Sequence, residues 1–214
     1  MTQFCFDNLL KMIAESKHDI RVMCVISEVE YIKVCEDYGF DFVTFDNDPL
    51  GAKINHGIKA ALFYEWDYLM MMNSDDVIKA ELIDRYYEEY FTMKHPFFGI
   101  DKVTYVKFGT TEAREFCYDY SVLGIGKCIR RDVVELAFKK LGQLYRPDLN
   151  RCLDDTMMDN LMKLKVYPRM VKYEGMLAMD FKSDVNIWPW EKFKDRGKVV
   201  CYNPESAEVS LTAK

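Results

Sequence analysis

The chain has 214 residues, of which half are hydrophobic and 30% are charged, and its net charge is -6 at pH 7. This composition is typical of one globular domain. No apolar run reaches the ~18 residues that a membrane-spanning helix needs. The negative net charge argues against general nucleic-acid binding, which depends on clustered cationic residues.

The cysteines indicate a reducing environment. They lie at positions 5, 24, 35, 117, 128, 152 and 201, with no Cys-x-x-Cys pair, which argues against a zinc ribbon or a redox dithiol. Most lie in apolar stretches, so we expect buried, reduced thiols and a cytoplasmic protein. The first ten residues contain Asp7 and no Lys or Arg, unlike the start of a secretion signal.

Helical and strand patterns alternate along the first half of the chain. Helices are predicted over residues 6–15, 28–38 and 52–65, and strands over 20–26, 41–45 and 67–72. In the second half the pattern predicts helices over 80–93, 131–141 and 154–164, and strands over 97–108, 116–123 and 176–182. The order predicts an α/β fold with a mostly parallel, doubly wound sheet and a mixed C-terminal half.

Ligands of such sheets collect beyond the carboxyl ends of the strands. The strand predicted at 67–72 runs directly into Asn73, Ser74, Asp75 and Asp76. Mg²⁺ and Mn²⁺ prefer oxygen ligands, so the two adjacent carboxylates indicate a metal site. The same acidic residues could instead cap a helix beginning near residue 78, and the residues alone leave both interpretations open. No glycine-rich dinucleotide or phosphate-loop motif follows any predicted strand.

Several segments together resemble glycosyltransferase family 2, whose members have the GT-A fold. The segments are PLGAKINHGI (49–58), WDY (66–68), NSDD (73–76), GIGK (124–127), RRD (130–132), LDD (153–155) and DFKSDVNIW (180–188). The resemblance runs from about residue 7 to 193 and is closest to small bacterial and phage-encoded members. It implies one GT-A-like domain over 1–214: a nucleotide-sugar and metal half (1–110), an acceptor half (111–193) and a tail (194–214).

The resemblance implies a metal-dependent, inverting transfer of a sugar from a nucleotide-sugar donor to an acceptor hydroxyl. Asp75 and Asp76 match the acidic pair that binds Mn²⁺ or Mg²⁺, with Asp76 the better candidate for a direct ligand, and Asp180 is the expected third ligand. Asp154 and Asp155 match the catalytic base, with Asp155 favoured. The alternative for that acidic pair is the N-cap of a helix over 156–164.

Four further residues match positions that approach the nucleotide or its phosphates: Lys53, Asn55, Ser74 and Lys182. An exposed helix lysine at Lys53, and a surface ion pair between Asp180 and Lys182, are the competing interpretations. The acceptor is left open between a glycan, a small molecule and a modified nucleobase, the last suggested by the phage-type relatives.

The sequence departs from the family at its start, where residues 1–10 have a helical pattern in place of the first strand. A missing strand would expose a sheet edge, so self-association into a homo-oligomer through that edge is expected. The missing strand also keeps open a degenerate, non-catalytic binding or assembly module. A nucleotidyltransferase is a further alternative, since it too uses paired carboxylates and a metal, but it would need a Gly-rich and basic phosphate loop near the N-terminus, and the sequence has none.

Overall fold

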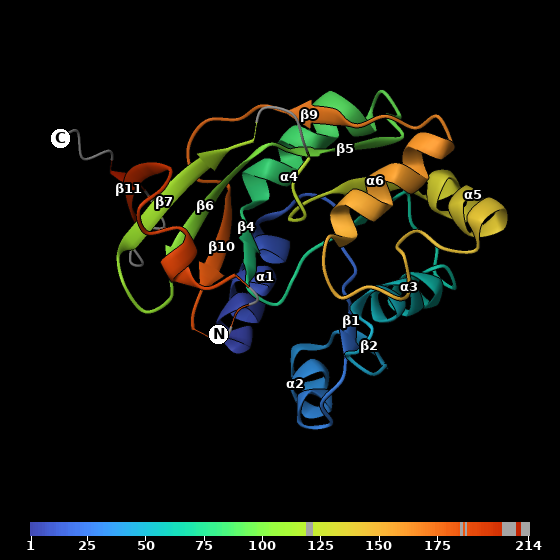
Figure 1. The fold of residues 1–214 in the computed structure, drawn as a ribbon, viewed down its shortest axis with the longest axis horizontal. Coiled ribbons are helices and arrows are strands. Elements are labelled where there is room, and N and C mark those ends of the chain that lie inside the picture. Colours follow the sequence, from blue (N-terminus) through green and yellow to red (C-terminus); the bar gives the residue numbers. More distant parts are fainter. Residues whose placement is uncertain (119–121, 185, 187, 203–208, 211–214) are drawn as a thin grey trace. The chain divides into compact units, whose positions relative to one another are not determined.

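Helices and strands of the first 70 residues occur in the predicted order. They are α1 (Thr2–Glu15), β1 (Met23–Ile26), α2 (Glu30–Tyr38), β2 (Asp41–Thr44), α3 (Leu50–Ala61) and β3 (Tyr68–Met70). They are seen in a computed structural model, which describes residues 1–118, 122–184, 186, 188–202 and 209–210 (Figure 1). Gly39 ends α2 in the left-handed conformation, with φ of 69°.

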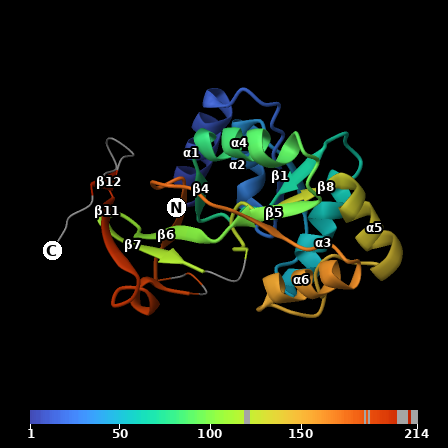
Figure 2. The same ribbon diagram turned by 90° about the horizontal axis from the view of Figure 1, so that it is seen from above.

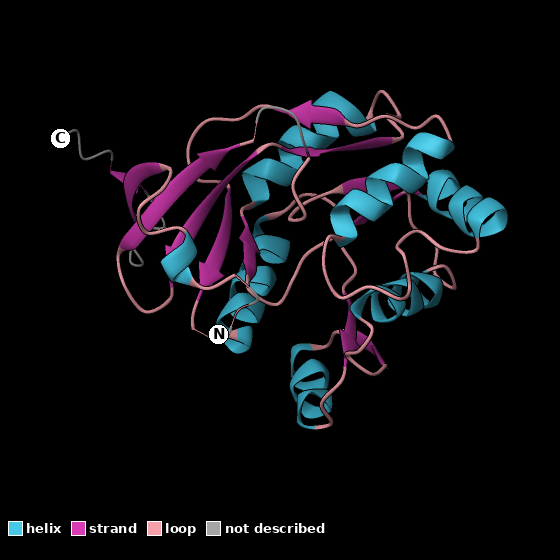
Figure 3. Ribbon diagram, in the orientation of Figure 1, coloured by secondary structure: helices cyan, strands magenta, loops and turns pink. Residues whose placement is uncertain are grey.

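The chain divides into two units, each of which is built from separated stretches of sequence. The first comprises residues 1–17, 70–127 and 169–214, and the second comprises 18–69 and 128–168. Figure 3 shows that strands and helices occur in both.

The second unit contains the doubly wound element that the sequence predicted. β1 and β2 pair in parallel, with Val25 opposite Val43. The side chain of Cys24 hydrogen-bonds to that of Cys35 on α2, whereas a Cβ atom on Gly57 of α3 would lie 2.1 Å from Val25. Because adjacent strand residues point to opposite faces, α2 and α3 cover opposite faces of the strand pair.

The two remaining helices of the second unit follow the predictions closely, whereas the strand that precedes them was not predicted. β8 (Cys128–Arg130) leads directly into α5 (Arg131–Leu141), and α6 (Leu153–Lys163) follows after a loop. β3 is hydrogen-bonded to β8. Both helices begin within one residue of their predicted start.

The first unit is built on a sheet with both parallel and antiparallel pairs. In the described part of the chain it has six strands in the order β12-β11-β7-β6-β10-β4. The strands are β4 (Asp76–Ile78), β6 (Lys102–Lys107), β7 (Glu112–Cys117), β10 (Ala178–Lys182), β11 (Lys198–Tyr202) and β12 (Val209–Ser210). β10 runs parallel to β6 and antiparallel to β4. Two further strands of this unit, β5 (Phe97–Ile100) and β9 (Arg169–Val171), pair with each other in parallel.

One face of the six-stranded sheet is apolar and is covered by α1. The register places Phe181 beside Val106, Val106 beside Ala113, and Ala113 beside Val200. Phe4 of α1 meets Phe181 with ring centroids 4.8 Å apart. Figure 2 shows α1 and α4 (Ala80–Tyr86) on the same side of β4 and β6. Since strand side chains alternate, the neighbouring residues Asp180 and Lys182 must lie on the other face.

Besides shifts of a few residues at element ends, three predictions are wrong about the element itself. Residues 76–78 form β4, which the sequence assigned to a turn and helix; the run Val77-Ile78 is too short to show a period, and its pairing with distant β10 decides its conformation. The helix predicted over 80–93 is α-helical only to Tyr86 and continues as a π-helical turn, Tyr87–Phe91. The predicted strand over 97–108 is two strands, β5 and β6.

Two other predictions have a partial outcome. Of the strand predicted over 116–123, residues 116 and 117 belong to β7, and residues 119–121 lie outside the described part. The segment predicted as a tail from residue 194 supplies β11. No helix in the described residues is long and apolar enough to cross a bilayer.

Gly51, near the start of α3, provides a test of this packing. A Cβ atom there would lie 1.9 Å from the carbonyl oxygen of Arg146, a backbone atom that cannot rotate away. Although alanine favours helices by ~1 kcal/mol over glycine, we expect Gly51→Ala to lower the free energy of unfolding by about 1–3 kcal/mol. Urea unfolding measures this; Lys59→Ala, at an exposed site of the same helix, is the control, with a change of about 1 kcal/mol or less. A stabilising Gly51→Ala would show that this contact is not formed.

Candidate functional site

Two carboxylates face each other across the pairing of β4 with β10. In this antiparallel pair, Asp76 lies directly opposite Asp180. The neighbouring pair in the register is Val77 opposite Met179. Direct partners share a face of the sheet and have Cβ atoms about 4.5–5.5 Å apart. Like charges at such positions repel, so strand pairing holds these two side chains where electrostatics alone would separate them.

A third carboxylate comes from the turn before β4. The backbone carbonyl of Asp75 accepts a hydrogen bond from Phe181 N at 2.8 Å, which ties the turn to β10. One oxygen atom from each of Asp75, Asp76 and Asp180 lies within 4.8 Å of the others. These three residues, which the sequence placed in one metal site, therefore converge.

Burial makes this cluster electrostatically costly. Asp76 is 1% exposed, and burial, followed by the charges of Asp180 and Asp75, raises its pKa well above the ordinary value. Burial and the charge of Asp75 raise the pKa of Asp180 to about 7, against the partial opposition of Lys182. Three carboxylates in one buried place favour either a proton or a cation.

The hydrogen bonds around Asp76 leave a place for such a cation. Its Oδ2 accepts a hydrogen bond from Asn73 N at 2.7 Å, whereas its buried Oδ1 has no hydrogen-bond partner. A buried acceptor without a partner is uncommon and costly. Asp180 Oδ1 is likewise buried without a hydrogen-bond partner, and three carboxylates at close range with two such oxygens fit a hard divalent ion such as Mg²⁺ or Mn²⁺.

Lys182 and Asn186 complete the surroundings of the carboxylates. Lys182 Nζ lies 2.6 Å from Asp180 Oδ1 and 3.6 Å from Asp75 Oδ2. Both contacts are ion pairs, and the one to Asp180 is the closer. With side chains 7% and 15% exposed, Lys182 and Asp180 are not the surface ion pair that the sequence left open.

Asn186 was missed as a site residue although it lies in one of the family-like segments. Its Nδ2 donates to Asp75 Oδ2 at 2.5 Å, and its Oδ1 accepts from the backbone N and the hydroxyl of Ser183. It thereby orients a candidate metal ligand. Only the shared motif pointed to it, because an Asn at that spacing has no distinctive sequence signal.

Aromatic residues line the same face of the sheet. Tyr105, the register partner of Asp180 on β6, stacks on Phe193 with centroids 4.0 Å apart. Trp190 is 2% exposed, so it is a core residue, whereas Trp188 is 58% exposed.

The remaining predicted site residues divide between the two units. Ser74 is an exposed turn residue beside Asp75 in the first unit. In the second unit, Lys53 on α3 donates to Asn47 Oδ1 at 3.0 Å, and burial lowers its pKa. Asn55 is buried and holds the backbone of Leu144 and Tyr145 through both ends of its amide, so its observed contacts are structural.

Asp154 and Asp155 are exposed in the first turn of α6, also in the second unit. The helix begins at Leu153 after Cys152, so neither aspartate is its N-cap residue. Their charges nevertheless stabilise the positive end of the helix dipole. Either carboxylate is open to solvent.

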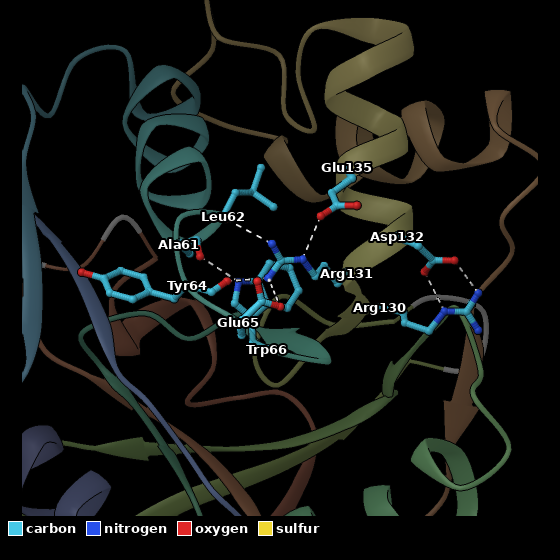
Figure 4. A network of polar contacts seen from close by, with 9 residues as sticks. All are labelled: Ala61, Leu62, Tyr64, Glu65, Trp66, Arg130, Arg131, Asp132 and Glu135. Carbon is cyan, nitrogen blue, oxygen red and sulfur yellow. Dashed lines mark hydrogen bonds and ion pairs between the residues drawn. The ribbon is translucent and has the colours of Figure 1, made fainter.

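Two family-like segments, WDY and RRD, meet in a structural network within the second unit (Figure 4). The Arg131 guanidinium donates to the backbone carbonyls of Leu62 and Tyr64, just beyond α3, and to Glu135 Oε1 at 2.7 Å. It also lies 5.3 Å from the ring of Trp66, whose Nε1 donates to Ala61 O at 2.8 Å. These contacts satisfy carbonyl groups at the end of α3. The residues in this part of the resemblance therefore stabilise the fold.

Comparison with known proteins shows where this fold occurs. Two structures of TarS residues 1–349 from S. aureus, one of them in complex with UDP-GlcNAc, match with TM-scores of 0.57 and 0.54 at 16% identity. Each match covers 86% of this chain and 57% or 55% of the TarS chain, so this chain spans less than two thirds of those structures. The α/β, GT-A-like fold predicted from the sequence is confirmed.

A structure of CMP:2-keto-3-deoxy-manno-octonic acid synthetase complexed with CTP matches 89% of this chain and 85% of its own, with 11% identity and a TM-score of 0.49, too low to carry an argument. No protein-family model and no curated protein matches the sequence.

The charge cluster gives a pH-dependent prediction for the metal-free protein. In the folded state Asp180 keeps its proton up to a pKa of about 7, whereas an unfolded chain loses it near about 4. The folded state thus binds more protons over this range, and the free energy of unfolding falls as the pH rises from about 4 to about 7.

Asp76→Asn removes one buried charge, and its Oδ1 can still accept from Asn73 N. We expect it to stabilise the protein in EDTA at pH 7.5 by on the order of 1 kcal/mol or more, and by much less at pH 4.5.

Urea unfolding at the two pH values checks this, with Asp159→Asn on the exposed side of α6 as the control, expected to change stability by less than ~0.5 kcal/mol. A loss of stability in Asp76→Asn at pH 7.5 would mean that the three carboxylates do not repel one another.

Proposed function

We propose that this protein transfers a sugar from a nucleotide-sugar donor to an acceptor hydroxyl, using a divalent ion held by Asp75, Asp76 and Asp180. The observation that carries the proposal is the convergence of these carboxylates around a buried Asp76 oxygen without a partner. A cluster that served only the fold would be more stable with fewer charges. The GT-A-like fold supports this assignment of the cluster.

The donor class follows from the charge of the ligand that such an ion would hold. A bound Mg²⁺ or Mn²⁺ would neutralise charge that builds up on a leaving diphosphate. TarS, which shares the fold, binds UDP-GlcNAc in one of its structures. We therefore take a nucleoside diphosphate sugar as the donor, with Ser74 and Lys182 beside the carboxylates as candidate contacts and Lys53 as a further one, whereas the amide of Asn55 is already engaged by backbone groups.

In the proposed reaction the acceptor oxygen forms a bond to the anomeric carbon as the bond from that carbon to the diphosphate oxygen breaks. The nucleoside diphosphate leaves with the electron pair. Asp155 takes the proton of the acceptor hydroxyl, with Asp154 as the alternative base. Attack from the side opposite the leaving group inverts the configuration.

The first test is binding. Mn²⁺ with UDP or UDP-GlcNAc should raise the melting temperature of the protein, because both bind only the folded state. In the Asp76→Asn variant the metal-dependent part of this shift should vanish while the metal-free protein stays folded. Asp159→Asn, which leaves the cluster intact, should respond like the unsubstituted chain.

A panel of other nucleoside diphosphates belongs in the same experiment. The absence of a shift with every nucleotide and metal, in a folded sample, would support a non-catalytic module instead. Release of pyrophosphate from a nucleoside triphosphate would identify a nucleotidyltransferase.

The second test separates Asp155 from Asp154, two exposed neighbours in the same helical turn. Asn at either position removes one negative charge from the start of α6, so both variants should lose a similar ~0.3–1 kcal/mol of stability. Asp155→Asn should lower the release of nucleoside diphosphate by about 100-fold or more without weakening donor binding, and Asp154→Asn should lower it by less than ~10-fold. The opposite ranking would assign the base to Asp154, and equal, small effects would place it elsewhere.

A further inference from the structure

Lys182 is a buried ammonium group inside the carboxylate cluster. Its residue is 6% exposed, and it lies two positions beyond Asp180 on β10, on the same face of the sheet. Lysine is seldom buried unless it is paired. The groups around Lys182 therefore determine which charges its ammonium group compensates.

Two kinds of group surround the ammonium. Asp180 and Asp75 lie on one side, with Nζ–oxygen distances of 2.6 and 3.6 Å. On another side, Nζ lies 5.4 Å from the ring centre of Tyr105 and 5.8 Å from that of Phe193. Aromatic faces attract a cation, so the rings on this side and the carboxylates on the other both attract the ammonium group.

The charges of these groups do not balance. Three carboxylates and one ammonium carry a formal charge of -2 when all are ionised, which is the charge that one divalent ion cancels. No ion pair joins Lys182 to Asp76 among the described contacts, and Asp76 Oδ1 has no hydrogen-bond partner. The ammonium thus forms ion pairs with two of the carboxylates, whereas at Asp76 its charge opposes only part of the effect of burial and of the neighbouring carboxylates.

We propose that Lys182 is a built-in counter-ion, which stabilises the carboxylates when no metal ion is bound and competes with a divalent ion for Asp75 and Asp180. The proposal rests on the metal-binding part of the proposed function. It makes Lys182 a positioning residue that sets the cation affinity of the site: strong compensation without metal lowers the affinity for metal.

A neighbouring lysine supplies a matched control. Lys107 on β6 is the direct register partner of Lys182, but it pairs with Glu112 at 3.3 Å and its side chain is 41% exposed. An exposed ion pair contributes little to stability. Lys107→Met therefore removes the same chemical group one strand away from the cluster.

The test measures the affinity for Mn²⁺ alone by isothermal titration calorimetry. Lys182→Met deprives the carboxylates of their competing cation, so we expect Mn²⁺ to bind on the order of tenfold more tightly than to the unsubstituted protein. Lys107→Met should change the affinity less than ~2-fold. In EDTA, Lys182→Met should lower the melting temperature by at least about 5 °C, and saturating Mn²⁺ should restore it.

A double variant keeps the test decisive if Lys182→Met does not fold. Lys182→Met with Asp180→Asn has the same formal charge of -2 as the unsubstituted cluster, so it should fold in EDTA if charge compensation is the role of Lys182. Failure of this double variant to fold would show that Lys182 acts through packing, and the proposal would be wrong.

Unchanged or weaker Mn²⁺ binding by Lys182→Met, or no Mn²⁺ binding by either protein, would also overturn the proposal. The titration uses no sugar donor, so its result is independent of turnover. Tighter binding of Mn²⁺ without any sugar transfer would refute the proposed function alone, and sugar transfer with unchanged Mn²⁺ affinity would refute the counter-ion alone.

Discussion

Backbone pairing between β4 and β10 places like charges against each other. The register that joins Val77 to Met179 also joins Asp76 to Asp180, and a shift by one residue would turn the apolar pair away from the core. The hydrophobic face therefore fixes the carboxylates in opposition. The free energy gained by packing under α1 offsets their repulsion, and the site depends on this balance.

The two faces of the six-stranded sheet thus have different roles: one packs against α1, and the other carries the carboxylates. One carries the row from Phe181 through Val106 and Ala113 to Val200, buried against α1. The other carries Asp180 beside Tyr105, which in turn is beside Arg114. The period of two in β-strands connects the faces: each apolar residue that stabilises the fold sets the direction of a polar neighbour. A rigid, packed support of this kind is what a cation site needs to hold its ligands in place without the ion.

The sequence predicted much of the fold because strongly patterned segments keep their local preference. Helices α1, α2, α5 and α6 and the parallel pair β1–β2 are near their predicted places. β4 was not predicted because three residues carry no period, and the pairing that makes them a strand comes from a segment a hundred residues later. Asp75 and Asp76 stood out in the sequence as a pair, but Asp180 was joined to them only by the family resemblance. Burial and the missing partner of Asp76 Oδ1 depend on tertiary packing, so only the structure could reveal them.

The carboxylate cluster departs from the usual rules of sheet pairing and burial, whereas the apolar face of the same sheet follows them. This contrast is informative about function. Opposed like charges, a buried lysine and a carboxylate oxygen without a partner each cost stability, and they concentrate around Asp76, Asp180 and Lys182. Replacing the charges with apolar residues would serve the sheet better if the sheet were the only purpose. A divalent ion would relieve the repulsion and satisfy the unpartnered oxygen. Lys182, in the role proposed for it, would relieve part of the repulsion before an ion binds, and this combination is what a site that binds its ion reversibly requires.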